Sequence, residues 1–258
     1  SAQRLFKTVG ELVKWPDYMQ VWPGHGAGSA CGKALGAVPQ STIGYEKRFN
    51  PAIRAAGSEQ KFVEFILDGQ PEPPLYFARM KRWNKLGPPV LGGVPKPQEM
   101  EPAQLGKLDP RKVVVIDTRT WDEFRRGHVP GSLYVPLDNL FPGIAGSYIV
   151  EDQEVVLIAP HDRVDALVRT LIHVGVDRFV GWVDPARFGE YGKSGGRLAT
   201  SAEIDVAEAK RRIGDKESYF LDVRRNDEFA AGHIPSANLA PHTRLPAHLD
   251  SLPKNRPI

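Results

Sequence analysis

The residues of this sequence whose types could most clearly support chemistry belong to a pattern that occurs twice. The first copy places Asp117 and Arg119 at the end of an apolar run and continues to a Gly-His-Val-Pro turn at His128. The second copy repeats these residue types at a constant offset of 105 residues, beginning with Asp222 and Arg224. A carboxylate and a guanidinium two residues apart can form an ion pair or cap a loop, and so hold a site in shape. Agreement at seven positions without a gap indicates two copies of one module.

Strands and helices alternate around this pattern. Apolar residues between 164 and 174 recur at helical spacing, and Gly175 stands where that helix should end. Strands followed by helices predict an α/β fold with a mainly parallel sheet covered on both faces. The strands expected in the first copy are 113–116, 133–135, 154–159 and 179–183, and those in the second are 219–221 and 238–240.

The chain is expected to contain more than one structural unit. A Pro/Gly-rich stretch without periodicity precedes the first copy and is typical of a linker. Before it, apolar residues from Leu5 to Val13 predict an amphipathic helix, residues 18–22 predict a short strand, and Ser58 is a plausible N-cap. This leading unit has too few strands for a whole domain, so we expect it to be the C-terminal part of a larger one. The predicted segments are a unit at 1–86, a linker at 87–98, a module at 99–193 and half of a second module at 197–258.

Composition is that of a soluble globular protein, with 41% apolar and 25% charged residues. The formal charge of +3 gives no reason to expect nucleic acid, and no apolar run is long enough to cross a membrane. Cys31 is the single cysteine, which excludes a disulfide within the chain and favours the cytoplasm. The sequence opens at Ser1 without a signal peptide, so we expect an internal fragment. One basic cluster is interpreted as a solvated helix face: Arg79, Lys81, Arg82 and Lys85.

The repeated pattern Asp-x-Arg, Glu-Phe, Gly-His-(Ile/Val)-Pro resembles the rhodanese family. The resemblance implies a cysteine in a loop after the next strand, where N–H groups at a helix N-terminus stabilise a thiolate or persulfide. In the first copy this position falls at Ala159, and Pro160 removes a donor, so we predict a module without catalytic activity. In the second copy the nucleophile is expected about four residues beyond Ile258.

The same resemblance assigns a supporting role to the paired Asp and Arg residues. In the family they brace the active loop, and this is the role expected of Asp117, Arg119, Asp222 and Arg224. An ion pair or a cap explains these four residues without catalysis.

Pro23-Gly24-His25 resembles the late metal-site segment of the metallo-β-lactamase fold, an αββα architecture. The segments that begin at Pro23, Ser41 and Tyr76 resemble fusions of that domain with rhodanese modules, best known as persulfide dioxygenases. The family's His-x-His-x-Asp-His cluster does not occur in this sequence, so His25 alone cannot hold a metal. His25 is a candidate metal ligand in the parent protein, or a structural residue. Cys31 is a candidate sulfur relay or a buried structural residue.

The resemblance implies a parent enzyme with Fe(II) that oxidises a persulfide with O₂ to sulfite, together with sulfur transfer by a rhodanese cysteine. The expected partners are persulfide or thiosulfate-type small molecules, and a homo-oligomer is left open. This chain alone is expected to bind no metal and to show neither activity. One alternative is a non-catalytic binding or dimerisation module. Another is a zinc hydrolase of the glyoxalase II type, since two zinc ions favour hydrolysis and one iron favours oxygenation.

Overall fold

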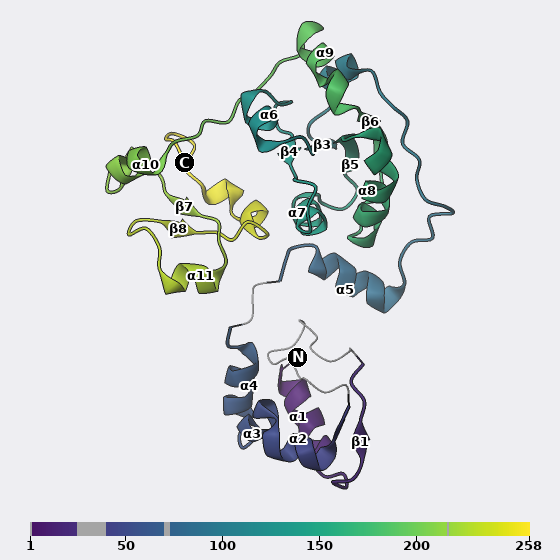
Figure 1. Ribbon diagram of the computed structural model, residues 1–258, viewed down its shortest axis with the longest axis vertical. Coiled ribbons are helices and arrows are strands. Elements are labelled where there is room, and N and C mark those ends of the chain that lie inside the picture. Colours follow the sequence, from purple (N-terminus) through teal and green to yellow (C-terminus); the bar gives the residue numbers. More distant parts are fainter. Residues whose placement is uncertain (1, 25–39, 70–72, 216) are drawn as a thin grey trace. The chain divides into compact units, whose positions relative to one another are not determined.

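The computed structural model describes residues 2–24, 40–69, 73–215 and 217–258. The chain divides into two compact units, Ser1–Pro71 and Glu72–Ile258, whose elements are labelled in Figure 1. His25 and Cys31 lie outside the described residues. Within the described part of the chain, no helix is long and apolar enough to cross a bilayer.

The first unit is mostly helical. The predicted strand becomes the short β1, which pairs antiparallel with β2. Ser58 caps a helix as predicted, because its Oγ accepts a hydrogen bond of 3.2 Å from the backbone N–H of Lys61. Phe62 and Ile43 are the fully buried side chains of this unit, and the Phe62 ring packs 5.6 Å from that of Phe6. The elements are α1 (Ala2–Leu12), β1 (Gln20–Val21), β2 (Ser41–Thr42), α2 (Ile43–Phe49), α3 (Pro51–Ala55) and α4 (Glu59–Leu67).

The second unit begins with a helix and continues into the first copy of the repeat. Its strands and helices alternate as the sequence predicts. The elements up to the end of this copy are α5 (Phe77–Leu86), η1 (Pro102–Lys107), β3 (Val113–Asp117), α6 (Trp121–Arg126), β4 (Leu133–Tyr134), α7 (Phe141–Tyr148), β5 (Glu154–Ile158), α8 (His161–His173), β6 (Phe179–Val183), η2 (Pro185–Arg187) and α9 (Phe188–Lys193).

A four-stranded parallel sheet in the order β4-β3-β5-β6 forms the centre of this module (Figure 1). Side chains alternate between its two faces, as strand geometry requires. Val113 and Val115 pack with η1 and α9, whereas Ile116 packs with α7 and α8. The sheet is therefore covered on both faces, which confirms the α/β fold predicted from the sequence. The register places Asp117 opposite Ile158, so the carboxyl ends of β3 and β5 lie side by side.

The basic helix α5 packs on this module, whereas the sequence predicted that residues up to 86 belong to the leading unit. Arg79 is buried rather than solvated, so its interpretation as part of an exposed face was wrong. Its guanidinium donates to the carbonyls of Val174 at 2.7 Å, Ile149 at 3.3 Å and Gly146 at 3.4 Å. These carbonyls lie at the ends of α7 and α8, where helices leave acceptors without intrahelical partners. The other three basic residues of the cluster, Lys81, Arg82 and Lys85, are exposed.

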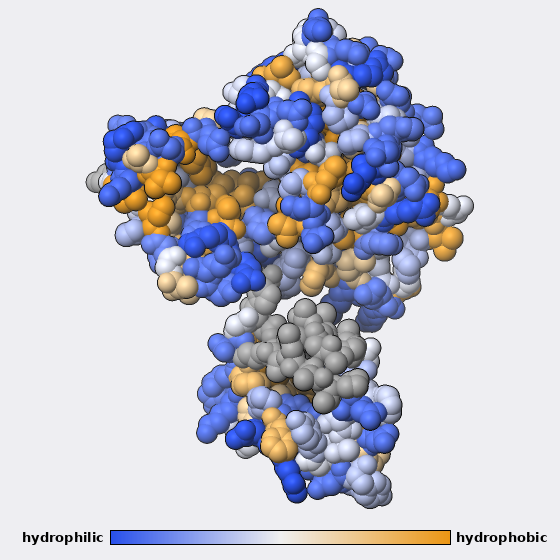
Figure 2. Space-filling model, viewed as in Figure 1, coloured by the Kyte–Doolittle hydropathy of each residue, from blue (hydrophilic) through white to orange (hydrophobic). Residues whose placement is uncertain are grey.

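The second copy forms a smaller arrangement, in which β7 and β8 pair parallel. Hydrophobic side chains that face the core in the first copy are more exposed here. Val129 is 7% exposed, whereas Ile234 at the matching position is 37% exposed. Figure 2 shows hydrophobic residues at the surface in the region of β7 and β8. The elements are α10 (Val206–Arg212), β7 (Leu221–Asp222), α11 (Asn226–Ala231), β8 (Asn238–Leu239), η3 (Leu245–Ala247) and η4 (Leu249–Ser251).

Candidate functional site

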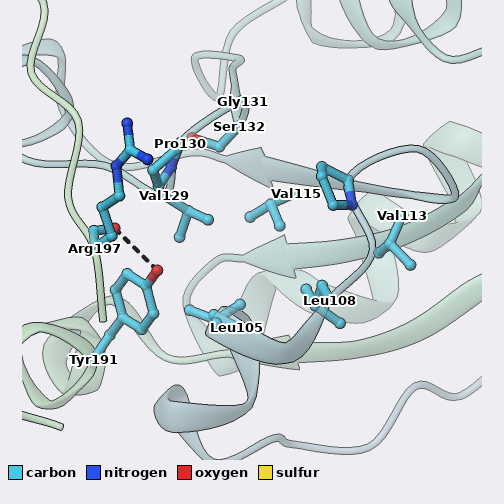
Figure 3. Close-up of a pocket in the computed structure, with 12 residues that line it drawn as sticks. Leu105, Leu108, Val113, Val115, Val129, Pro130, Gly131, Ser132, Tyr191 and Arg197 are labelled. Atoms are coloured by element: carbon cyan, nitrogen blue, oxygen red, sulfur yellow. Dashed lines mark hydrogen bonds between the residues drawn. The ribbon is translucent and has the colours of Figure 1, made fainter. Parts of the chain in front are cut away.

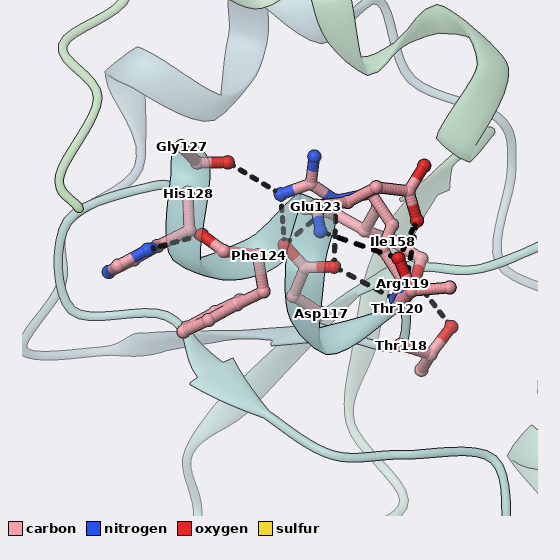
Figure 4. Close-up of polar contacts among 9 residues, drawn as sticks. All are labelled: Asp117, Thr118, Arg119, Thr120, Glu123, Phe124, Gly127, His128 and Ile158. Atoms are coloured by element: carbon pink, nitrogen blue, oxygen red, sulfur yellow. Dashed lines mark hydrogen bonds and ion pairs between the residues drawn. The ribbon is translucent and has the colours of Figure 1, made fainter. Parts of the chain in front are cut away.

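The carboxyl end of β3 carries a closed ion pair between Asp117 and Arg119 (Figure 4). The Arg119 guanidinium donates to both carboxylate oxygens of Asp117, with distances from 2.7 to 3.1 Å. It also donates to the carbonyl of Gly127 at 2.8 Å, which ties the strand end to the end of α6. Its remaining face covers the ring of Phe188, with the guanidinium carbon 3.6 Å from the ring centre. The Asp117 side chain is 0% exposed and the Arg119 side chain is 7% exposed. Arg119 therefore braces the module and offers little surface to a ligand.

The second copy reproduces this pairing in a more open setting. Arg224 donates to Asp222 at 2.6 to 3.1 Å and to the carbonyl of Gly232 at 2.9 Å. These hydrogen bonds lower the pKa of the Asp222 carboxyl below its ordinary value. The Arg224 side chain is 46% exposed, in contrast to Arg119. The two copies therefore share one local geometry but differ in how far it is buried.

The histidine of each copy fastens the turn that follows. The Nδ1 of His128 lies 2.9 Å from the carbonyl of Phe124, and that of His233 lies 2.9 Å from the carbonyl of Phe229. A carbonyl only accepts, so Nδ1 carries the proton in both contacts. Each imidazole also stacks on its phenylalanine ring. Both histidines thus have a structural explanation within the turn.

Ala159 lies directly after β5 and is fully buried. Its backbone N–H donates to the carbonyl of Val183 at 3.1 Å, so the residue still pairs within the sheet. The preceding carbonyl, that of Ile158, accepts from both the backbone N–H and the hydroxyl of Thr118, at 3.1 and 2.8 Å. Helix α8 begins at His161, only two residues after the strand. Only Ala159 and Pro160 therefore connect β5 to α8.

The sequence did not indicate two of these contacts. Phe188 lies 69 residues after Arg119, and nothing in its own neighbourhood marks it as the surface beneath a guanidinium. Thr118 occupies the variable position between Asp117 and Arg119, so the pattern alone gives it no role.

Metal-binding residues do not gather in the described part of the chain. Within residues 2–24, 40–69, 73–215 and 217–258, no group of three or more His, Cys, Asp or Glu side chains could hold an ion. His25, the candidate ligand, lies outside these ranges. The described residues therefore do not fit the iron that the resemblance implies.

Comparisons with known proteins agree with the repeat. The profile of the rhodanese-like domain matches residues 102–184 and again 205–258. No curated protein matches the chain. Among solved structures, a metallo-β-lactamase from Staphylococcus aureus subsp. aureus COL is 34% identical, with a TM-score of 0.54. The match covers 71% of this chain and 51% of that one, so the chain spans about half of its relative's length.

A thiosulfate sulfurtransferase from Pseudomonas aeruginosa is similar to a smaller extent. It is 20% identical with a TM-score of 0.32, and the match covers 60% of this chain and 36% of that one. The domain profile matches more than half of the chain and coincides with both copies of the repeat. The chain therefore belongs to the rhodanese-like domain family, with structural similarity to a metallo-β-lactamase.

Proposed function

We propose that this chain is part of a persulfide dioxygenase–sulfurtransferase fusion, in which the first rhodanese-like module does not itself transfer sulfur. One observation carries the proposal: 34% identity to a protein described as a metallo-β-lactamase, in a chain that also contains two rhodanese-like matches. Metallo-β-lactamase and rhodanese segments in one chain are consistent with two coupled reactions. One is the oxidation of persulfide sulfur, and the other is the transfer of sulfane sulfur.

The roles of the two modules follow from their strand ends. In the first module, Ala159 is buried and bonded within the sheet and has no nucleophilic side chain, which supports a module without sulfur transfer. In the second module, Asp222 and Arg224 keep the bracing geometry while remaining partly exposed. Sulfur transfer is therefore assigned to the second module. Persulfide oxidation is assigned to the metallo-β-lactamase part, with Fe(II) held by residues other than those described.

The test uses the natural protein that carries this sequence. Glutathione persulfide is supplied under air, and O₂ consumption, sulfite and bound metal are measured together. Stoichiometric sulfite formation with about one iron per protein is the expected result. Two zinc ions, with thioester hydrolysis and no O₂ consumption, would establish the glyoxalase II type of hydrolase instead.

A second candidate is that the first module serves only as a binding or dimerisation element. It is favoured by the closed strand ends of the module, since the Thr118 hydroxyl and the Ala159 N–H both form hydrogen bonds to strand carbonyls. Deletion of residues 97–196 from the natural protein separates the two roles. Loss of oligomerisation with retained persulfide oxidation supports the assembly role, and an unchanged oligomeric state contradicts it.

A further inference from the structure

The first module also contains a cavity, whose lining does not include the residues at the ends of β3 and β5 (Figure 3). It has a volume of about 180 Å³ and lies on the face of the sheet covered by η1 and α9. Asp117, Arg119 and Ala159 take no part in its lining. Its floor is formed by apolar side chains from β3, η1 and the turn before β4: Leu105, Leu108, Val113, Val115 and Val129.

The hollow opens to the surface of the module, although four of its five floor residues are buried: Leu105, Val113, Val115 and Val129. An apolar cavity of ~150 Å³ is enough to admit a group the size of benzene. The floor of this cavity is therefore suited to an apolar group of about six carbons.

The rim of the cavity is polar and supplies hydrogen-bond donors. The Ser132 hydroxyl is buried and, among the described residues, has no hydrogen-bond partner. Buried hydroxyls are rarely left without one, so this group points to an absent acceptor. Arg197 also lines the cavity, and Figure 3 shows its side chain running alongside Pro130. No carboxylate of the described residues pairs with it, whereas the neighbouring Tyr191 hydroxyl is already engaged with the Arg197 carbonyl at 3.0 Å.

The second copy of the repeat carries different residues at the positions that line this cavity. At the constant offset of 105 residues, Val115 is replaced by the larger Phe220 and Ser132 by Ala237. The other floor residues differ as well, since Lys210, Ile213, Ser218 and Ile234 stand at the positions of Leu105, Leu108, Val113 and Val129. The second copy therefore keeps neither the floor residues nor the rim hydroxyl of the first.

We propose that the first rhodanese-like module binds a small monocarboxylate with an apolar tail of about six carbons. The tail lies against Val115 and the other floor residues. The carboxylate accepts from the Ser132 hydroxyl and the Arg197 guanidinium, which are both donors and suit an anionic oxygen pair. This site is independent of the function proposed above.

The proposal is tested on the 258-residue chain with sodium heptanoate, whose tail has six carbons, followed by calorimetry and by NMR. Saturable binding with shifts in the amide signals of Gly131 and Ser132 is expected. The matched probe heptylammonium has the same tail and the opposite charge, so it should bind at least tenfold more weakly, about the effect of one charge-assisted hydrogen bond. Equal affinity for both probes, or no saturable binding of heptanoate, overturns the proposal.

Three variants locate the site, two of them taken from the second copy. Val115→Phe should abolish binding because the ring fills the floor. Ser132→Ala and Arg197→Gln should each weaken binding about tenfold. Arg163→Gln, which alters an exposed arginine outside the cavity, is the control and should leave affinity unchanged. Circular dichroism checks folding, and the two rim variants keep the test decisive if Val115→Phe does not fold. Retained binding in both rim variants would place heptanoate elsewhere and overturn the proposal.

Discussion

The backbone N–H of Ala159 donates to the carbonyl of Val183 at 3.1 Å, so the position at which the rhodanese pattern predicts a cysteine belongs to the sheet in this module. The side chain is fully buried, and α8 begins two residues later. A thiol placed here would be shielded from solvent and would lack the ring of free N–H groups that lowers the pKa of a reactive cysteine. The proposed lack of sulfur transfer in this module would therefore follow from backbone geometry as well as from the missing sulfur atom.

Restoring the cysteine should not restore sulfur transfer. We expect Ala159→Cys, made in a Cys31→Ser background, to form no thiocyanate from thiosulfate and cyanide. Its thiol should resist alkylation until denaturant is added, because burial raises the pKa of a thiol and blocks access. His161→Cys is the matched control, since it places a thiol on an exposed position two residues away and should be alkylated rapidly. Turnover by Ala159→Cys would show that the strand end can open into an active loop.

The buried and the exposed ion pairs should differ sharply in their effect on stability. Asp117→Asn leaves Arg119 buried opposite a neutral partner and should cost about 3–5 kcal/mol. Asp222→Asn affects a pair whose arginine is 46% exposed and should cost less than about 1 kcal/mol. Native-state hydrogen exchange read by mass spectrometry over residues 113–183 and 217–258 separates the two modules. Equal losses of protection in both variants would contradict the role of burial.

Local patterns in the sequence were sufficient to predict the strands, the parallel sheet and the duplicated Asp-x-Arg geometry. These features depend on residues within one turn or one strand, such as the hydrogen bond from the Arg119 N–H to Asp117 at 3.1 Å. The cap at Ser58 was predicted for the same reason.

Contacts between segments far apart in the sequence could not be predicted from such local patterns. The basic cluster on α5 has the composition of a solvated face, yet Arg79 contacts carbonyls 67 to 95 residues away. Only the folded arrangement brings those carbonyls together at the ends of α7 and α8. The cavity above Val115 was missed because an alternating apolar strand gives the same pattern whether its face is filled or hollow.

A carboxyl at the entrance to β3 provides a pH-dependent prediction. Hydrogen bonds from the side chain and then the backbone N–H of Arg111 lower the pKa of Asp109 to about 2. A lowered pKa in the folded state stabilises the fold above the ordinary value of 3.8, and this contribution is lost as the pH falls from 3.8 towards 2. Because the Arg111 side chain is 87% exposed, we expect the effect on overall stability to be small.

The carboxyl carbon signal of Asp109 in an NMR titration measures this directly. Its midpoint should lie near 2, and Arg111→Gln should move it back towards 3.8, with the remaining backbone hydrogen bond preventing full recovery. Arg178→Gln changes an arginine that pairs with other carboxylates and should leave the midpoint unchanged. A midpoint near 3.8 in the unaltered protein would show that the Arg111 contacts do not persist in solution.

The last prediction concerns Arg79, which connects α5 to the module. Arg79→Met should cost about 2–4 kcal/mol, because it leaves three carbonyls at the ends of α7 and α8 with one donor fewer each while retaining much of the side-chain volume. Arg79→Lys should recover only part of this loss, since one ammonium group cannot reproduce the spread of a guanidinium. Arg82→Gln on the same helix breaks an exposed pair with Glu151 and should cost less than about 1 kcal/mol. Urea unfolding of the four proteins, with hydrogen exchange at residues 145–150 and 171–176, is the measurement. If these amides are protected from exchange in Arg79→Met as strongly as in the unaltered chain, then α5 is a neighbour of the module and not part of its fold.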